Sequence, residues 1–524
     1  MTRLLSSKLV LLGLVIVALA ALYGVAGISH PVALATGSPS SALSQAPVTS
    51  AIRACASPGG PGGGDVALIA AGQAGGTAIA SPDPGGAASA TSAAGSGSAS
   101  LSRLSAAGSP DPGPALFTLS RPGVLTRTAI KEASAKSGLQ PSGLRTTGGT
   151  LPAAPSRGGV VVQATGSMAA ALAVEQTSPT GITTAACPGP GTDFWFVGPG
   201  QSIAADLHLY LMNTDIQPAD ADVDIYTDSG PSLVSRDTGI SVPPHGLLVQ
   251  SLAKLLHGSR VVALHVRTST GRVAAMLRVS KTAGDPGAWI PASLAPSRNM
   301  VIPGLPAAAG TRELYIVVPG LGSAHVKLTA VTAKGSYQPT GGSGINLPGG
   351  SAIAVPLPSL SKVNASIRIK SSVPVTASIA VTGGAAGAPG VFTVATPPIL
   401  EQAVAADNIS ESTEGTVVLS APQGTARVRI TDAPSGKHAT AARPSKIVVI
   451  AAKHTVVFRL HRPARTPAQS PYAVVVTPLS GSGPVYAGRV LIISGTVQSI
   501  LPLGPALTAV PLPAARESIS AAQP

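Results

Sequence analysis

Aromatic and charged residues are both scarce in this chain. Phe, Trp and Tyr make up 3% of the 524 residues, and charged residues make up 11%, which is less than half of the usual charged share. Hydrophobic residues reach 44%, but many of them are Ala and Val, which build thin cores. We therefore expect β-sandwich modules and do not expect a large apolar pocket for a small solute. The length predicts three or four domains.

The sequence also lacks the common motifs of catalysis and metal binding. It contains no H-E-x-x-H, no Cys/His cluster, no phosphate-binding G-x-x-x-x-G-K-[ST] and no G-x-S-x-G. We predict that the protein is not an enzyme and has no catalytic residue, no metal site and no cofactor. Because a catalytic triad assembles only in space, an extracellular glycan or peptide hydrolase with a site at a module joint remains the alternative.

Cysteine occurs only twice, as Cys55 and Cys187. In an exported protein, two cysteines indicate one disulfide, whereas a metal site would need more ligands than this pair offers. Loop-closure models assign about 4–5 kcal/mol of stabilisation to a bond that spans so long a loop. We predict a structural disulfide between Cys55 and Cys187.

The N-terminal residues 1–35 have the pattern of a membrane signal-anchor. Residues 9–28 carry no charge and are long enough for a helix to cross the hydrocarbon core of a bilayer. Arg3 and Lys8 precede the apolar run, which predicts a cytoplasmic N-terminus and export of everything that follows. The alternative is a secretory signal cleaved near Ala35, which would release the protein. Residues 36–50 form a Ser/Pro/Ala-rich linker.

Short segments rich in Val and Ala recur roughly every 105 residues: MAAALAV at 168–174, VAAMLRV at 273–279, VTASIAV at 375–381 and, more weakly, VYAGRVL at 485–491. We expect each to close one β module. The predicted fold is all-β, with tandem Ig-like β-sandwich modules after an N-terminal transmembrane helix, and a β-propeller-like closed repeat is the alternative. The predicted modules are residues 51–187, 188–299, 300–400 and 401–512, with a low-complexity insertion at 81–114 and a disordered tail at 513–524.

The second module contains the clearest strand pattern. Residues 261–267 and 273–279 are rich in β-branched side chains, and Gly271 lies where the chain must reverse, so we predict a β-hairpin with Val273 and Val279 in the core. The sequence DFWFV at 193–197 is the densest aromatic patch. It could form a carbohydrate-stacking platform, but we favour a core strand with Trp195 buried.

The net charge of +14 calls for an anionic partner or a solvated basic surface. The predicted fourth module holds most of the concentrated positive charge. Nucleic acid is disfavoured there, because aromatic residues for base stacking are few and the module is exported. We therefore expect an anionic wall polymer, anionic lipid headgroups or an envelope protein as partner. The candidate binding residues are Arg427, Arg443, Lys446 and Arg462.

The order of these features resembles a known family. An N-terminal anchor, a module with paired cysteines, the segment CPGPGTDFWFVGPG at 187–200 and the repeated Val/Ala-rich strands are similar to a family of uncharacterised actinobacterial proteins that are anchored in the membrane or secreted. The resemblance implies an extracytoplasmic location and a modular layout, and it transfers no catalytic residue.

These observations together predict a non-catalytic scaffold or binding protein of the cell envelope. It would be held by a single membrane-spanning segment with the bulk of the chain outside the cytoplasm. Its partner would be an anionic glycan, lipid headgroups or a membrane enzyme, and the hydrolase stays as the alternative.

Overall fold

The computed structural model describes residues 45–56, 64–71, 96–105, 108, 115–119, 125–130, 158–178, 183–204, 206–232, 237–252, 256, 258–281, 287–382, 390–408, 413–434, 445–461 and 472–511. The chain divides into two compact units, Pro47–Val510 and a smaller one that comprises Met1–Ala46 and Pro511–Pro524. The predicted anchor and the predicted tail lie outside the described residues. In the part of the chain that is described, no helix is long and apolar enough to span a membrane.

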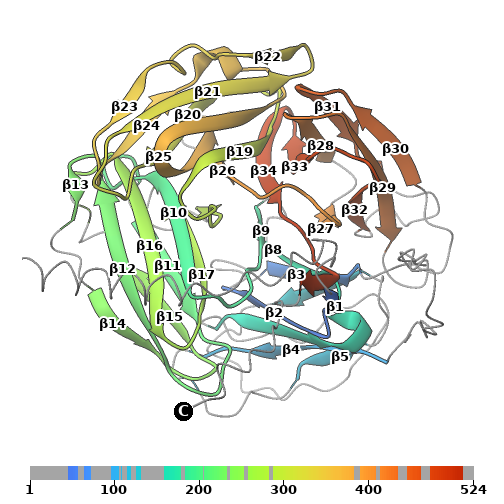
Figure 1. Ribbon diagram of the computed structural model, residues 1–524. Coiled ribbons are helices and arrows are strands. Elements are labelled where there is room, and N and C mark those ends of the chain that lie inside the picture. Colours follow the sequence, from blue (N-terminus) through green and yellow to red (C-terminus); the bar gives the residue numbers. More distant parts are fainter. Residues whose placement is uncertain are drawn as a thin grey trace, which may run out of the picture. The chain divides into compact units, whose positions relative to one another are not determined.

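The unit Pro47–Val510 contains four β-sandwiches in sequence order, which confirms the predicted all-β class and the tandem arrangement of sandwiches (Figure 1). In the first sandwich, the sheets have the strand orders β2-β7-β4-β5 and β6-β3-β8-β9. Its strands are β2 (Ser50–Cys55), β3 (Gly64–Ala70), β4 (Ser98–Arg103), β5 (Phe117–Leu119), β6 (Thr126–Ile130), β7 (Val160–Thr165), β8 (Leu172–Thr177) and β9 (Thr184–Ala186). A short 3-10 helix, η1 (Gly166–Met168), joins β7 to β8.

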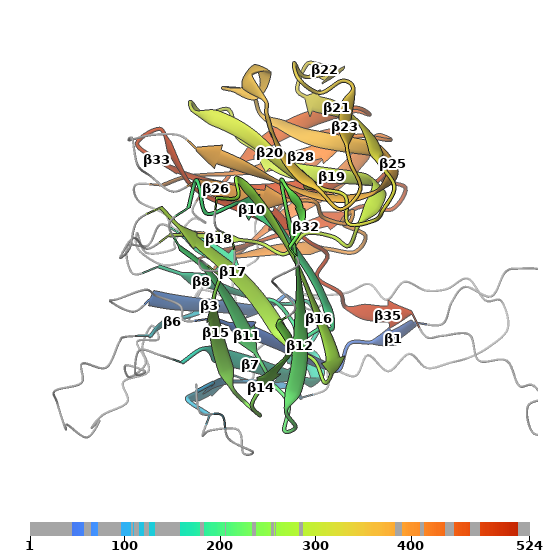
Figure 2. The same ribbon diagram turned by 90° about the vertical axis from the view of Figure 1, so that its left-hand side faces the viewer.

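The second sandwich pairs one sheet of order β10-β16-β12-β13, with β14 also beside β12, with a second sheet of order β15-β11-β17-β18. Figure 2 shows strands of both sheets running side by side. Its strands are β10 (Asp193–Pro199), β11 (Asp206–Met212), β12 (Ala219–Thr227), β13 (Gly230–Pro231), β14 (Asp237–Val242), β15 (Leu247–Ser251), β16 (Val261–Thr270), β17 (Ala274–Ser280) and β18 (Ala288–Ile290).

In the third sandwich, one long strand belongs to both sheets. The N-terminal half of β25 pairs with β19 and β21, and its C-terminal half pairs with β20 and β26. The strands are β19 (Ser297–Leu305), β20 (Thr311–Val317), β21 (Ala324–Thr332), β22 (Gly335–Tyr337), β23 (Ile345–Leu347), β24 (Ala352–Pro356), β25 (Ala365–Thr382) and β26 (Val391–Val394), with the 3-10 helix η3 (Pro358–Leu360).

The fourth sandwich has the sheet orders β27-β32-β29-β30 and β31-β28-β33-β34. Its strands are β27 (Ala403–Asn408), β28 (Thr413–Ala421), β29 (Ala426–Pro434), β30 (Ser445–Ile450), β31 (His454–Arg459), β32 (Tyr472–Pro478), β33 (Tyr486–Ile493) and β34 (Thr496–Leu503). A further pair of strands, β1 (Gln45–Pro47) and β35 (Ala509–Pro511), forms a two-stranded sheet.

Alternation of side chains explains why these segments form strands with one inward face. Along β12, the side chains of Ala221, Val223 and Ile225 are buried, while Asp222 and Asp224 between them are only partly buried. Because successive side chains of a strand point to opposite faces, the Ala and Val of this sequence fill one face and its few charges occupy the other. Asp222 accepts a hydrogen bond from the backbone N–H of Gly239 in β14, at the point where the pairing of β12 and β14 shifts its register.

Residues 261–267 and 274–279 lie in strands, as predicted, but the two strands do not pair with each other, so the predicted hairpin is wrong. β16 pairs with β10 and β12, whereas β17 pairs with β11 and β18, so the chain crosses from one sheet to the other at Gly271. The φ angle of Gly271 is 67°, a conformation that glycine adopts without steric cost. Val273 and Val279 are buried, as predicted. The crossing lets both strands bury apolar side chains in the space between the sheets.

Part of the predicted low-complexity insertion at 81–114 is also structured. Ser98–Arg103 forms β4, which lies between β7 and β5 in its sheet. Ala99 and Leu101 are buried in the core of the first sandwich, and this apolar alternation outweighs the surrounding Ser and Gly. Thr126–Ile130, which follows the insertion in sequence, also forms a strand.

Apolar clusters join each sandwich to the next within this unit and then join the fourth to the first. Four representative pairs across the successive joints are Leu104 with Tyr210, Val317 with Phe196, Ile302 with Ile500, and Ile69 with Val475, each pair belonging to one cluster. The sandwiches therefore pack in a closed circuit. They are not propeller blades, because the chain passes repeatedly between two sheets within each sandwich, whereas a blade is one sheet.

Candidate functional site

Four edge strands, one from each sandwich, surround a central cavity. β9, β18 and β34 each end the strand order of a sheet, and β26 pairs only with β25 among the described strands. β18 contacts β26, β26 contacts β34, and β34 contacts β9. Figure 1 labels β9, β26 and β34 near the middle of the unit. The cavity between them has a volume of about 270 Å³.

The lining of this cavity is mainly apolar. None of the described side chains that line it is charged. The large apolar side chains of the lining are Phe196, Met276, Trp289, Ile290, Leu294, Phe392, Ile500 and Leu501. We did not expect a large apolar pocket, and this cavity lies between the sandwiches, where three aromatic side chains, Phe196, Trp289 and Phe392, come together.

Five hydroxyl side chains interrupt the apolar lining: Thr183, Thr184, Ser293, Thr396 and Ser499. The hydroxyls of Thr184 and Ser499 lie 2.6 Å apart and form one hydrogen bond. Thr396 is 7% exposed, and its Oγ1 has no hydrogen-bond partner among the described residues. A buried hydroxyl without a partner costs about 1–3 kcal/mol. Among the described lining residues, Thr396 is the one whose buried side-chain polar atom has no partner.

A buried ion pair closes the circuit between the first and fourth sandwiches. Nη2 of Arg489 in β33 donates hydrogen bonds to Oε2 of Glu175 in β8, at 2.9 Å, and to Oγ1 of Thr184, at 2.7 Å. Oε1 of Glu175 accepts a hydrogen bond from the backbone N–H of Ala406. Because Thr184 also lines the cavity, this ionic network lies directly behind the cavity wall.

Burial dominates the electrostatics of that joint. The side chains of Glu175 and Arg489 are 2% and 0% exposed. Burial raises the pKa of Glu175 to about 7. The nearby Arg489 guanidinium acts in the opposite direction, but its effect is smaller than that of burial. Nε and Nη1 of Arg489 have no hydrogen-bond partner in the described part of the chain. The ion pair thus fixes which surfaces meet at this joint, while two nitrogens of Arg489 lack hydrogen-bond partners among the described residues. Glu175 changes its protonation state near neutral pH.

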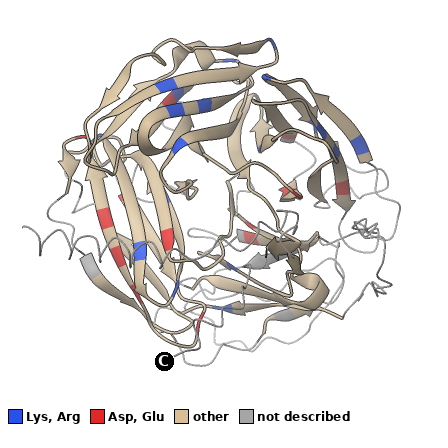
Figure 3. Cartoon of the chain, in the orientation of Figure 1, with Lys and Arg blue, Asp and Glu red and all other residues tan. Residues whose placement is uncertain are grey.

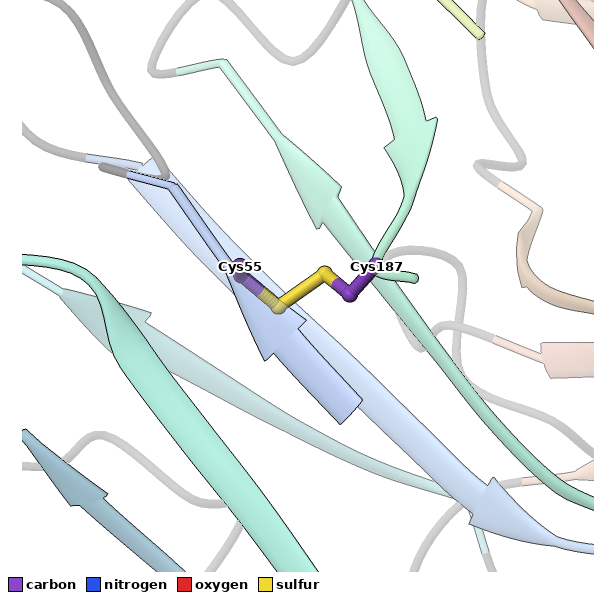
Figure 4. The surroundings of a disulfide bond; sticks show 2 residues. All are labelled: Cys55 and Cys187. Atoms are coloured by element: carbon purple, nitrogen blue, oxygen red, sulfur yellow. A yellow bond between two sulfur atoms is a disulfide. The ribbon is translucent and has the colours of Figure 1, made fainter. Parts of the chain in front are cut away.

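The two cysteines form the predicted disulfide, shown in Figure 4. Cys55 ends β2 in one sheet of the first sandwich, and Cys187 directly follows β9 of the facing sheet. The bond therefore ties the two sheets together across 132 residues of chain. Both side chains belong to the core cluster of this sandwich, as a structural bridge requires.

The aromatic patch at 193–197 supplies a core residue and a covered tryptophan. Phe196 belongs to the core of the second sandwich, and Trp195 on the opposite face of β10 is 4% exposed. The Trp195 ring stacks on the His265 ring, with centroids 3.9 Å apart. The predicted burial of Trp195 is confirmed, and a covered ring offers no stacking platform.

The predicted anion-binding residues do not all share one face. Arg427 is exposed on β29, next to Arg429 on the same outward face. Lys446 is exposed on β30 opposite Ile430, so it lies on the other face of that sheet. Arg443 and Arg462 fall outside the described residues. The structure therefore places Arg427 beside a neighbour that the sequence had not singled out and separates it from Lys446.

Figure 3 shows Lys and Arg on strands of both the third and the fourth sandwiches. In the third sandwich, Lys327 and Lys370 are both exposed and are directly opposite each other on β21 and β25. Positive charge is therefore not confined to the fourth sandwich. In the part of the chain that is described, no group of three or more His, Cys, Asp and Glu side chains could hold a metal ion.

Sequence reasoning missed Glu175, Arg489 and Thr396. Two of them carried a usable signal, because Glu175 and Arg489 are single charges inside the apolar strands LAVEQT and YAGRVLII. A charge at such a position is almost never buried unless it is paired. Thr396 carried no such signal, since threonine is common in strands and loops alike.

The fold and site define a class: an all-β protein of four sandwiches in a closed circuit around a small apolar cavity. Within that class, the chain belongs to a family that is described as "Family of unknown function (DUF5719)", whose model matches residues 146–461. This bears out the resemblance to an uncharacterised family. No curated protein and no solved structure matches the chain.

Proposed function

We propose that the protein is a non-catalytic scaffold or binding protein of the cell envelope, anchored in the membrane by residues 1–35 with its sandwiches outside the cytoplasm. The basic residues before an uncharged run of membrane-spanning length support this orientation. The Cys55–Cys187 disulfide supports an oxidising compartment, where such bonds persist. If the segment were cleaved near Ala35, the same sandwiches would be secreted.

The observation that carries the proposal is a mixed basic and apolar strip on the fourth sandwich. Arg427 and Arg429 on β29 are exposed and lie opposite Val449 and Ile447 on β30. The side chains of Ile447 and Val449 are 54% and 58% exposed, on a strand at the edge of its sheet. We call these four residues the β29–β30 strip. Neither arginine forms an ion pair with a described residue.

This composition favours anionic lipid headgroups among the anionic partners. Each Arg near a negatively charged leaflet contributes about 1 kcal/mol of attraction. Exposed Ile and Val gain further free energy where they enter the boundary between headgroups and acyl chains. A wall glycan would use the two charges and leave the apolar side chains in water. The strip therefore contacts the membrane surface that also holds the anchor.

Site-specific photo-crosslinking of the full-length chain in the envelope of the producing cells tests this proposal. A photoreactive residue at Ile447 should form lipid adducts, and one at Leu321, which is fully exposed on the third sandwich, should not. Replacing both arginines (Arg427→Gln with Arg429→Gln) should lower the adduct yield at position 447 several-fold.

The matched control replaces another exposed pair of cations, with Lys327→Gln and Lys370→Gln. It removes the same charge from the third sandwich and should leave the adducts at 447 unchanged. If both double substitutions lowered the adduct yield at position 447 equally, net charge alone would explain the effect. Adducts at 447 with glycan or protein, and none with lipid, would reject the lipid surface as the partner.

A further inference from the structure

The central cavity has the features of a ligand site. It is formed by four sandwiches and is lined by large apolar side chains, among them Phe196, Trp289 and Phe392. It is partly open to solvent, since Ala186 and Ala292 in its lining are exposed. An apolar cavity of about 150 Å³ already stays dry and binds benzene. A volume of about 270 Å³ therefore offers room for roughly ten non-hydrogen atoms by the same proportion.

Charge narrows the class of ligand. No Lys, Arg, His, Asp or Glu side chain is part of the described lining. The nearest charges, Glu175 and Arg489, are paired with each other behind the wall and are not part of it. An ionised ligand would lose its hydration without gaining a partner, which costs several kcal/mol. The occupant must therefore be uncharged.

One hydroxyl of the lining can recognise a polar group on the ligand. Thr184 and Ser499 use their hydroxyls on each other, so they are less available to a ligand. Thr396 Oγ1 has no such partner among the described residues, and Thr396 is part of the lining. A ligand with one hydroxyl or carbonyl oxygen would satisfy it, and a site built to hydrogen-bond a hydroxyl discriminates against the analogue that lacks one.

We propose that the central cavity binds a small, uncharged, mainly apolar molecule of about ten non-hydrogen atoms that bears one hydrogen-bonding oxygen, with Thr396 as the group that recognises this oxygen. The site is independent of the β29–β30 strip, so the two proposals can fail separately. Its four walls come from four sandwiches, so an occupied cavity also stabilises the closed circuit by linkage.

Three probes that share the naphthalene ring test the proposal on the full-length protein in detergent: naphthalene, 2-naphthol and naphthalene-1-sulfonate. Binding is measured by isothermal titration calorimetry, together with quenching of Trp289 emission in a Trp195→Phe background, which leaves Trp289 as the single tryptophan. We expect 2-naphthol to bind about tenfold more tightly than naphthalene, and the sulfonate not to bind. Tight binding of the sulfonate, or no binding of either neutral probe below 1 mM, would overturn the proposal.

Two substitutions with matched controls locate the site. Ala186 lines the cavity and is exposed, so Ala186→Phe should fill the cavity without displacing core atoms and should abolish binding. Ala295→Phe is the control, because Ala295 is exposed but does not line the cavity. Thr396→Val keeps the shape of the side chain and should remove the preference for 2-naphthol while naphthalene still binds.

The outcomes separate cleanly. Loss of binding in Ala186→Phe with retention in Ala295→Phe supports the site, and equal behaviour of the two rejects it. An unchanged preference for 2-naphthol in Thr396→Val would reject the role of Thr396. Thermal unfolding of each variant, with the probe absent, checks that a loss of binding does not reflect a loss of folding.

Discussion

Glu175 is the residue whose environment departs most from that of an ordinary carboxylate. Its strand, β8, is otherwise apolar, and its partner Arg489 comes from the last sandwich. A neutral pair of apolar side chains would often be at least as stable at such a position, so the ion pair is better understood as a device that fixes which surfaces meet. Burial, which raises its pKa to about 7, makes that device sensitive to pH.

Replacing this side chain should change how stability depends on pH. Because the folded pKa of about 7 lies above that of the unfolded chain, the folded state holds more protons between about pH 4.5 and 7. The contribution of Glu175 to the free energy of unfolding is therefore greatest in acid and falls by about 3 kcal/mol as pH rises through that window. In Glu175→Gln this fall should be missing when urea unfolding is followed from pH 5 to pH 8.

The control for this prediction is Glu414→Gln, which changes an exposed carboxylate of the fourth sandwich. It should follow the wild-type pH profile closely. If the difference in stability between the wild type and Glu175→Gln stayed constant across the pH range, Glu175 would not titrate as its burial requires.

At the scale of the elements, the backbones of β19 and β33 approach each other so closely that there is no room for a Cβ atom between them. A Cβ atom added to Gly488 in β33 would lie 2.6 Å from the Cα atom of Gly304 in β19. Gly304 itself has a φ angle of 83°, which disfavours any other residue there. The joint between the third and fourth sandwiches thus depends on two glycines whose backbones face each other.

Gly488→Ala should push these two strands apart and lower the free energy of unfolding by about 1–3 kcal/mol, the usual cost of overpacking. Gly320→Ala is the matched control, because a Cβ atom there meets no atom within 4 Å. Urea unfolding midpoints of both variants provide the measurement. Equal midpoints would mean that the joint relaxes without cost.

The sequence allowed the strands to be predicted but not their pairing. In β16 and β17, β-branched side chains and the turn at Gly271 are local signals, and both strands lie where they were expected. Their partners are set by packing between distant segments, and no local pattern distinguishes a hairpin from a crossing between sheets. The cavity could not be predicted for the same reason, because its walls are short edge strands from four different sandwiches.

At the scale of the whole unit, closure of the circuit brings its two ends together. The backbone N–H of Val48 donates a hydrogen bond to the carbonyl of Thr508, at 2.8 Å, and that of Ala171 donates to Leu507. The unit Pro47–Val510 should therefore tolerate circular permutation, since exposed joints and adjacent ends are where new connections succeed.

A permutant that joins Val510 to Pro47 through a short Gly/Ser linker and opens at Ala295, between the second and third sandwiches, should fold with nearly unchanged stability. Opening at Val373, inside β25, should prevent folding, because that strand belongs to both sheets of the third sandwich. Circular dichroism and urea unfolding distinguish the two. Failure of the first permutant would show that the circuit needs its natural order of assembly.

The ion pair that closes the circuit can form only long after its first residue has been synthesised. Glu175 and Arg489 are 314 residues apart, and a ribosome adds about 5–20 residues per second. The first sandwich therefore emerges roughly 15 to 60 s before its partner exists. For that interval Ile69 and Ala171 have no fourth sandwich to cover them, and Glu175 has no counter-ion. In a chain with this architecture, the first sandwich therefore exposes the apolar surface of its joint for the longest time before the circuit closes.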